Sequence, residues 1–216
     1  MAIITISRLL GSDGAAIAER VAQEMSYELI TKRTLEKILE QYGLVHLDSF
    51  YQSPPRLWSR LDFETRHLVS MLNKTMLGIA KRGDAVILGR GGYAALHNFS
   101  GGLHVRVQAP LSVRVKRVLD REGSDDLHRT EKMVRENDKA RAIFVNGYYD
   151  ADFIDANQFH LVLDTSLISI DTATEWIVGA GQIAMSSPPP GTYLAKDIDV
   201  DPLLLDTIDN VLMPEE

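Results

Sequence analysis

The sequence contains no cysteine, which excludes disulfide bonds and thiolate metal sites. No apolar run approaches the 18 residues that a membrane span needs, and the first residues lack the basic-then-apolar pattern of a secretory signal. The net charge is -7, so the chain lacks the sustained positive surface that nucleic acids and anionic membranes require. We therefore expect a cytoplasmic protein that binds neither nucleic acid nor membranes.

Histidine and cysteine in the spacing of a metal site are also missing from the sequence. The six histidines include no pair at i and i+4, and cysteine is absent, so a metal-hydrolase site is not expected. The histidines are interpreted as ordinary surface or core residues. We predict no metal site made by the protein alone.

Apolar patterning predicts a single α/β domain. Strand-like runs occur at residues 3–6, 84–88, 103–108 and 160–163. Apolar residues recur at helical spacing over residues 17–25, 35–42, 61–82, 111–119, 127–145 and 169–183. Ser12 or Asp13 could cap the first helix, and Thr34 the second. Strands that alternate with helices indicate a parallel sheet with helices on both faces, which places ligands at the carboxyl ends of the strands.

The composition changes near residue 186. We predict a main domain over residues 1–185, followed by a proline-rich linker and an acidic tail over residues 186–216. Apolar residues of the tail, from Leu203 to Leu212, recur at helical spacing. The favoured interpretation is a short helix that docks on its own domain. The alternative is a contact with a partner, such as a homodimer through the tail.

The first strand leads into a glycine-bearing loop and then a helix, the layout of a phosphate cradle. Successive N–H groups and the helix N-terminus could bind a phosphate there. The residues of this candidate phosphate-binding loop are Gly11, Ser12, Asp13, Gly14 and Ala15. The usual motif, G-x-x-x-x-G-K-[ST], continues with a lysine and a hydroxyl, and neither is present. A tight turn that binds no ligand is therefore the alternative.

Arginines are the second feature of the predicted site. Arg114, Arg117 and Arg121 share one helical face, while Arg8 and Arg90 follow two strands directly. The next helix carries a further charged set: Arg135, Asp138, Lys139 and Arg141. Solvated faces and surface ion pairs are the alternatives. Arginines aimed at one crevice of an acidic protein nevertheless indicate a polyanion, because their planar donors neutralise phosphate charge.

Five segments then suggest a family. They read ITISR (4–8) with GSDG (11–14), VILGRG (86–91), LHVRV with AP and arginine (103–114), DKAR (138–141) and LVLDTS (161–166). In this order they resemble the cytidylate kinase-like group of P-loop nucleoside monophosphate kinases, over about residues 2–180. The resemblance implies a three-layer P-loop kinase-like fold with a parallel five-stranded sheet, including a strand near residues 27–30. It also implies a monophosphate-binding flap made of residues 44–58 and the helix that follows, and a helical lid around residues 135–141.

The resemblance assigns roles residue by residue. Gly11, Ser12 and Gly14 match the phosphate loop, and Arg90 matches the arginine that binds the acceptor phosphate. Further catalytic candidates are the lid pair Asp138 and Arg141, with Arg114 and Arg121 beside the lid. Three departures are the missing lysine, the missing hydroxyl, and glycine at position 91 where classical members keep an aspartate. Tyr148, Tyr149 and Phe153 are expected to pack on the far side of the lid.

Two hypotheses follow. One is a phosphotransferase that uses ATP, Mg²⁺ and a nucleoside monophosphate such as CMP, as the resemblance implies, although no metal ligand is identified. Arg8 could then compensate for the missing lysine, since its guanidinium leaves the same strand end. The other is an inactive nucleotide sensor or scaffold with the same fold. The accepted base is not predicted, because flap residues choose it.

Overall fold

The fold was analysed in a computed structural model that describes residues 3–43, 63–97, 99, 102–186 and 197–213. A five-stranded sheet has the order β2-β3-β1-β4-β5, and every adjacent pair is parallel. The strands are β1 (Ile3–Arg8), β2 (Glu28–Ile30), β3 (Ala85–Leu88), β4 (Gly102–Gln108) and β5 (Leu161–Asp164). The parallel sheet is confirmed, and so is the strand expected near residues 27–30.

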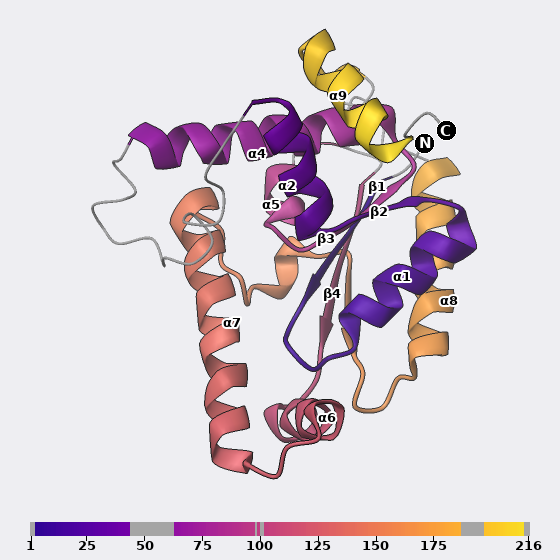
Figure 1. Cartoon of the computed structure of the whole chain (residues 1–216). Coiled ribbons are helices and arrows are strands. Elements are labelled where there is room, and N and C mark those ends of the chain that lie inside the picture. The colour runs from indigo at the N-terminus through magenta and orange to yellow at the C-terminus, as the bar shows by residue number, and fades with distance from the viewer. Residues whose placement is uncertain (1–2, 44–62, 98, 100–101, 187–196, 214–216) are drawn as a thin grey trace.

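Helices connect the strands and cover both faces of the sheet (Figure 1). They are α1 (Gly14–Met25), α2 (Lys32–Gln41), α4 (Phe63–Arg82), α5 (Gly92–Ala95), α6 (Leu111–Glu122), α7 (Leu127–Tyr149), η2 (Ala156–Gln158), α8 (Ile170–Ser186) and α9 (Pro202–Leu212). Helices α1 and α8 lie on one face, whereas α4, α5 and α7 lie on the other. Residues 135–141, predicted to form a lid, belong to α7, which is one continuous helix.

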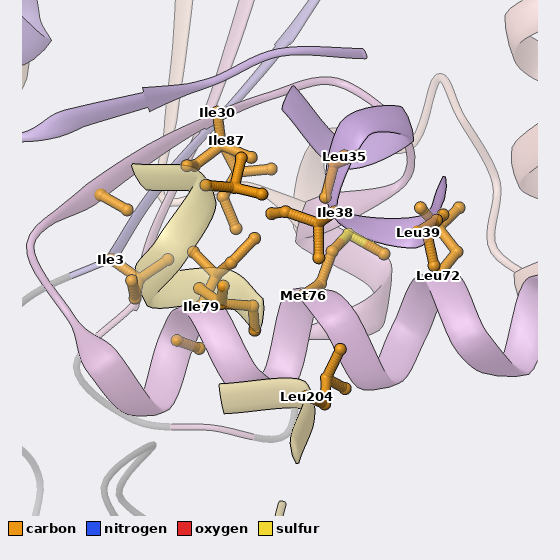
Figure 2. Close-up of a cluster of buried hydrophobic side chains, with 14 of the residues drawn as sticks. Ile3, Ile30, Leu35, Ile38, Leu39, Leu72, Met76, Ile79, Ile87 and Leu204 are labelled. Atoms are coloured by element: carbon orange, nitrogen blue, oxygen red, sulfur yellow. The ribbon is translucent and has the colours of Figure 1, made fainter. Parts of the chain in front are cut away.

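Alternation along the strands sends neighbouring side chains into two separate cores. Ile4 and Ile6 of β1 pack with α1 and α8, while Ile3 packs with the helices of the opposite face. Figure 2 shows this second core, in which Ile38 of α2 and Met76 of α4 are fully buried. The two cores fix the register of β1 and therefore the direction in which Arg8 leaves its end.

The C-terminal helix belongs to the second core. Leu204, Ile208 and Val211 of α9 are buried against α2 and α4. Figure 2 shows Leu204 in this core. Arg82 adds an ion pair to Asp209 with a nitrogen–oxygen distance of 2.8 Å. The expectation that this helix docks on its own domain is confirmed. A homodimer through the same apolar face would require the helix to leave that position.

One predicted helix cap is wrong, and the other is confirmed only in its position. Thr31, not Thr34, is the N-cap of α2, and Thr34 completes a reciprocal capping box with it. Asp13 occupies the N-cap position of α1, but its side chain makes no capping hydrogen bond. Ser12 does not cap α1 either, because its hydroxyl donates to the carbonyl oxygens of Leu9 and Val107. The polar side chains of this loop are engaged by the surrounding elements instead.

The predicted flap at residues 44–58 and most of the linker, residues 187–191, lie outside the described residues. Within the described ranges, no helix is long and apolar enough to span a membrane.

Candidate nucleotide-phosphate site

The loop between β1 and α1 lies at the carboxyl end of the central strand (Figure 1). Gly11 and Asp13 both have positive φ values, 80° and 58°, which turn the chain sharply before the helix. Gly11 also packs closely on α6, since a Cβ there would lie 2.6 Å from the carbonyl oxygen of Arg114. The first N–H groups of α1 therefore point out of a tight, well-supported turn, the geometry that favours an anion.

Arg8 crosses this turn from the end of β1. A Cβ on Gly14 would lie 2.6 Å from Cβ of Arg8 and 3.2 Å from its Cγ, so the arginine stem lies directly over the first residue of α1. Farther out, a Cβ on Gly89 would overlap Nη1 of Arg8. The guanidinium thus lies on the loop that follows β3. The expected meeting of the Arg8 and Gly89–Arg90 strand ends is confirmed.

Arg141 faces the same place from α7. Burial, followed by the charges of Arg141 and Arg90, lowers the pKa of Arg8 to about 10. Burial also lowers the pKa of Arg141. The charge of Asp138 opposes this shift, and the charges of Arg90 and Arg114 add to it. Three guanidinium groups from β1, the β3–α5 loop and α7 therefore lie close enough to destabilise one another's charge. An anion between them would relieve this repulsion.

Asp138 joins α7 to the loop from the other side. One of its oxygens accepts a hydrogen bond from the backbone N–H of Leu10 at 3.4 Å, and the other binds Nη1 of Arg114 at 2.7 Å. Arg114 is buried and also donates to the carbonyl oxygens of Ala109 and Leu10. Asp138 reaches Arg141 at only 3.9 Å. The pair Arg114 and Asp138 thus holds the loop, α6 and α7 together.

Asp13 engages the remaining arginines of α6. Its carboxylate lies 3.0 Å from Nη1 of Arg117 and 3.4 Å from Nη2 of Arg121. Arg117 also donates to the backbone oxygen of Thr165 at 2.7 Å and to its hydroxyl at 2.9 Å, which joins α6 to the end of β5. Arg121 lies at the rim, with a side chain that is 60% exposed. This acidic residue of the loop balances part of the positive charge around it.

Arg90 and Gly91 form the turn after β3. A Cβ on Gly91 would lie 2.5 Å from the ring of Tyr149, so this ring covers the glycine. The Tyr149 hydroxyl donates to Oδ1 of Asn73 at 2.7 Å and lies 3.5 Å from the carbonyl oxygen of Arg90. The expectation that Tyr149 packs away from the site is wrong. Its ring fills the space that a side chain at position 91 would otherwise take.

Some predicted residues do not join this set. Arg135 pairs with Glu131 on the exposed face of α7, as a surface ion pair. Ala15 is exposed at the start of α1 and offers its backbone alone. Among the described residues, no three acidic, histidine or cysteine side chains gather as a metal site. The site is therefore built from arginines and backbone N–H groups.

The sequence did not predict the contact between Asn73 and Tyr149, or the hydrogen bonds that join Arg117 to Thr165. Asn73 lies in a helix whose apolar stripe dominated its pattern, so no local signal marks it. Gly91 was a usable signal for Tyr149, because a glycine beside a binding arginine leaves a space that another element must fill. Arg117 was placed on the correct helical face, but its bond to Thr165 depends on tertiary contacts.

A parallel sheet with this loop and these arginines at its strand ends defines a protein with the α/β P-loop kinase-like fold. A sequence model of the cytidylate kinase-like family matches residues 3–167. The chain belongs to this family.

Curated relatives and a solved structure agree with this assignment. The cytidylate kinase of Methanococcoides burtonii is 29% identical over 164 residues, which are 76% of this chain and 87% of that protein. The cytidylate kinase of Natronomonas pharaonis is 29% identical over 175 residues, covering 78% of this chain and 83% of that protein. An uncharacterized protein from Eubacterium ventriosum has the same fold, with a TM-score of 0.70, 21% identity, and coverage of 84% of this chain and 98% of that chain.

Proposed function

We propose that the protein is a phosphotransferase that moves the terminal phosphoryl group of ATP to a nucleoside monophosphate, with CMP as the leading acceptor. The observation that carries the proposal is the meeting of Arg8, Arg90 and Arg141 beside the turn at Gly14. Guanidinium groups that repel one another form a site for a ligand with several negative charges. The names of the curated relatives favour the cytidine nucleotide as acceptor.

The chemistry needs little beyond positioning and charge stabilisation. An oxygen of the acceptor phosphate forms a bond to the terminal phosphorus of ATP. The bond between that phosphorus and the bridging oxygen breaks, and ADP leaves with the electron pair. The N–H groups at the start of α1 would bind the donor phosphates, and Arg90 the acceptor phosphate. Arg8 and Arg141 would stabilise the charge on the group in transit.

The described residues do not offer a protein-made Mg²⁺ site. Alanines stand at positions 15 and 16, where the usual loop presents a hydroxyl, and the described part of the chain has no cluster of metal-ligating side chains. Magnesium in such enzymes often arrives bound to the substrate phosphates. No catalytic step is therefore assigned to a metal held by this protein.

The alternative is a protein of the same fold that binds a nucleotide without transferring phosphate. The residues Gly14, Ala15 and Ala16 favour it, because they lack the lysine and hydroxyl of the usual loop. Loss of one such charge-stabilising group typically slows a reaction by about 10²- to 10³-fold. Both hypotheses use the same arginine site, so binding alone does not separate them.

A turnover assay separates the two functions. ADP release is followed by a coupled assay with ATP and CMP, dCMP, UMP or AMP, with and without Mg²⁺, and nucleotide binding is measured by calorimetry in parallel. We expect turnover to be fastest with CMP or dCMP and to fall when Arg141 is replaced by methionine. Nucleotide binding without ADP release would refute the enzyme and support the sensor.

A further inference from the structure

We propose that Arg8 supplies the phosphate-binding cation that loops of this fold usually carry at the position of Gly14. The cation then comes from the last residue of β1 and not from the first residue of α1. The inference rests on the proposed function in one respect, since the anion is taken to be the phosphate chain of a nucleotide.

Arg8 occupies the space above Gly14. The φ of Gly14 is not positive, so the backbone there would accept any L-residue. What excludes a side chain is Arg8, whose Cβ would lie 2.6 Å from the new Cβ. Both atoms are fixed to backbone and neither can swing away. A side chain at position 14 and an arginine at position 8 are therefore mutually exclusive, and this chain has taken the arginine.

The side chain of Arg8 runs from Gly14 to the loop after β3. The stem of Arg8 follows the volume that a residue at position 14 would fill, and then the guanidinium reaches the loop after β3. Gly89 leaves room there, because a Cβ at that position would overlap Nη1 of Arg8. Two glycines, one on each side, thus accommodate the full length of one arginine between the donor loop and Arg90.

Arg8 differs from the other arginines of the site in its partners among the described residues. In the part of the chain that the structure describes, the side chain of Arg8 makes no hydrogen bond or ion pair, whereas Arg114 binds two carbonyl oxygens and a carboxylate. Nη1 of Arg141, a buried atom of a half-buried side chain, has no hydrogen-bond partner there. A buried arginine that stabilised the fold would be paired, because an unpaired buried cation costs free energy. The fold therefore leaves donors of Arg8 and Arg141 unused, and an anion would satisfy them.

The test is an exchange of the cation between the two positions. Sodium tripolyphosphate is titrated calorimetrically into the full-length wild type, Arg8→Met, Gly14→Lys and the double variant Arg8→Gly/Gly14→Lys. Arg20→Met, an exposed arginine on α1, controls for the loss of one charge. Arg8→Lys retains the charge on a similar stem, and thermal unfolding verifies that every variant is folded.

We expect Arg8→Met and Gly14→Lys each to weaken binding by about 10- to 100-fold, as for the loss of a charged hydrogen bond. Arg8→Met removes the cation, and Gly14→Lys pushes the loop away from Arg8. The double variant is expected to bind within about threefold of the wild type, because the introduced lysine then enters the vacated space and restores the cation. Arg8→Lys should retain most of the affinity, and Arg20→Met should change nothing.

Three results would overturn the inference: no tripolyphosphate binding by the wild type, unchanged binding by Arg8→Met, or a folded double variant that binds no more tightly than the two single variants. Its failure is separate from that of the proposed function. Binding that depends on Arg8 without ADP release would refute the enzyme alone. Turnover that survives Arg8→Met with unchanged phosphate binding would refute the role of Arg8 alone.

Discussion

The arginines around the loop fall into two regions that differ in their partners. On the α6 side, Arg114 is paired with Asp138, and Arg117 with Asp13. On the β1–β3 side, Arg8 has no carboxylate or carbonyl partner for its side chain among the described residues, and Arg141 reaches Asp138 only at 3.9 Å. The same residue type therefore serves two purposes within one site. The paired region holds the loop, and the open region is available to a ligand.

This difference separates stability from binding. A paired, buried arginine contributes to the fold, and its removal leaves the partner carboxylate uncompensated. An unpaired arginine costs stability in the free protein and repays it when an anion binds. The comparison predicts opposite responses to substitution in the two regions.

The largest effect on stability is expected from Arg114→Met. It removes three hydrogen bonds and leaves Asp138 partly buried without its main partner, at a cost of about 3 to 5 kcal/mol in the free energy of unfolding. Urea denaturation measures the change. A loss below about 1 kcal/mol would remove the distinction between the two regions.

His104 tests how another buried basic group behaves. Its Nδ1 lies 2.8 Å from the hydroxyl of Thr5, and burial, followed by the charges of His160 and His97, lowers its pKa from 6.5 to about 4. As the pH falls, the unfolded state takes up the proton before the folded state does. The stability that neutral His104 contributes is therefore fully present above pH 6.5 and is lost as the pH falls toward 4. The loss should approach about 3 kcal/mol, from roughly 1.4 kcal/mol per pKa unit.

The measurement is the pH dependence of unfolding for the wild type and His104→Gln, with the exposed His128→Gln as control. The His104 variant should show a shallower slope between pH 6.5 and 4, and the control the wild-type slope. Equal slopes for all three proteins would contradict a neutral, buried His104.

Asp138→Asn should give an intermediate loss of stability, about 2 kcal/mol, because the charged bond to Arg114 is weakened while the side chain retains its shape. At the same time it removes a negative charge beside Arg141, so tripolyphosphate should bind more tightly. Denaturation and calorimetry on one sample test both changes. Weaker anion binding would show that Asp138 positions the open arginines rather than opposing the ligand.

The smallest effect on stability is expected from Arg8→Met. The half-buried cation has no described partner to lose, so the free energy of unfolding should stay unchanged or rise by up to about 1 kcal/mol. Urea denaturation without any phosphate in the buffer provides the value. A loss similar to that of Arg114→Met would assign Arg8 to the paired region.

Much of this organisation could be predicted from the sequence. Period-two and helical patterns located most strands and helices, and parallel strand ends predicted that residues near Arg8, Arg90 and Thr165 would meet. The short β2 needed the family resemblance, because three residues carry too little pattern. The cap at Thr31 was missed, and Asp13 was one of two candidates for the first helix, since several polar residues near a helix start compete for one role.

The pairing of the arginines could not be predicted, because it depends on which side chains face one another after folding. Spacing placed Arg114, Arg117 and Arg121 on one helical face. It did not show that Arg114 is buried and paired while Arg121 lies exposed at the rim. Glycines indicate where a neighbouring side chain needs room. Gly14 and Gly89 mark the path of Arg8, yet a sequence alone does not show which side chain occupies the space that a glycine leaves.

The most direct test of the account is a crystal structure of the protein with a non-hydrolysable ATP analogue and CMP. The account predicts that the guanidinium of Arg8 lies within hydrogen-bond distance of the terminal phosphate, with the acceptor phosphate on Arg90. A nucleotide whose phosphates lie on the α6 side, with Arg8 still resting on Gly89 and touching no phosphate, would contradict it.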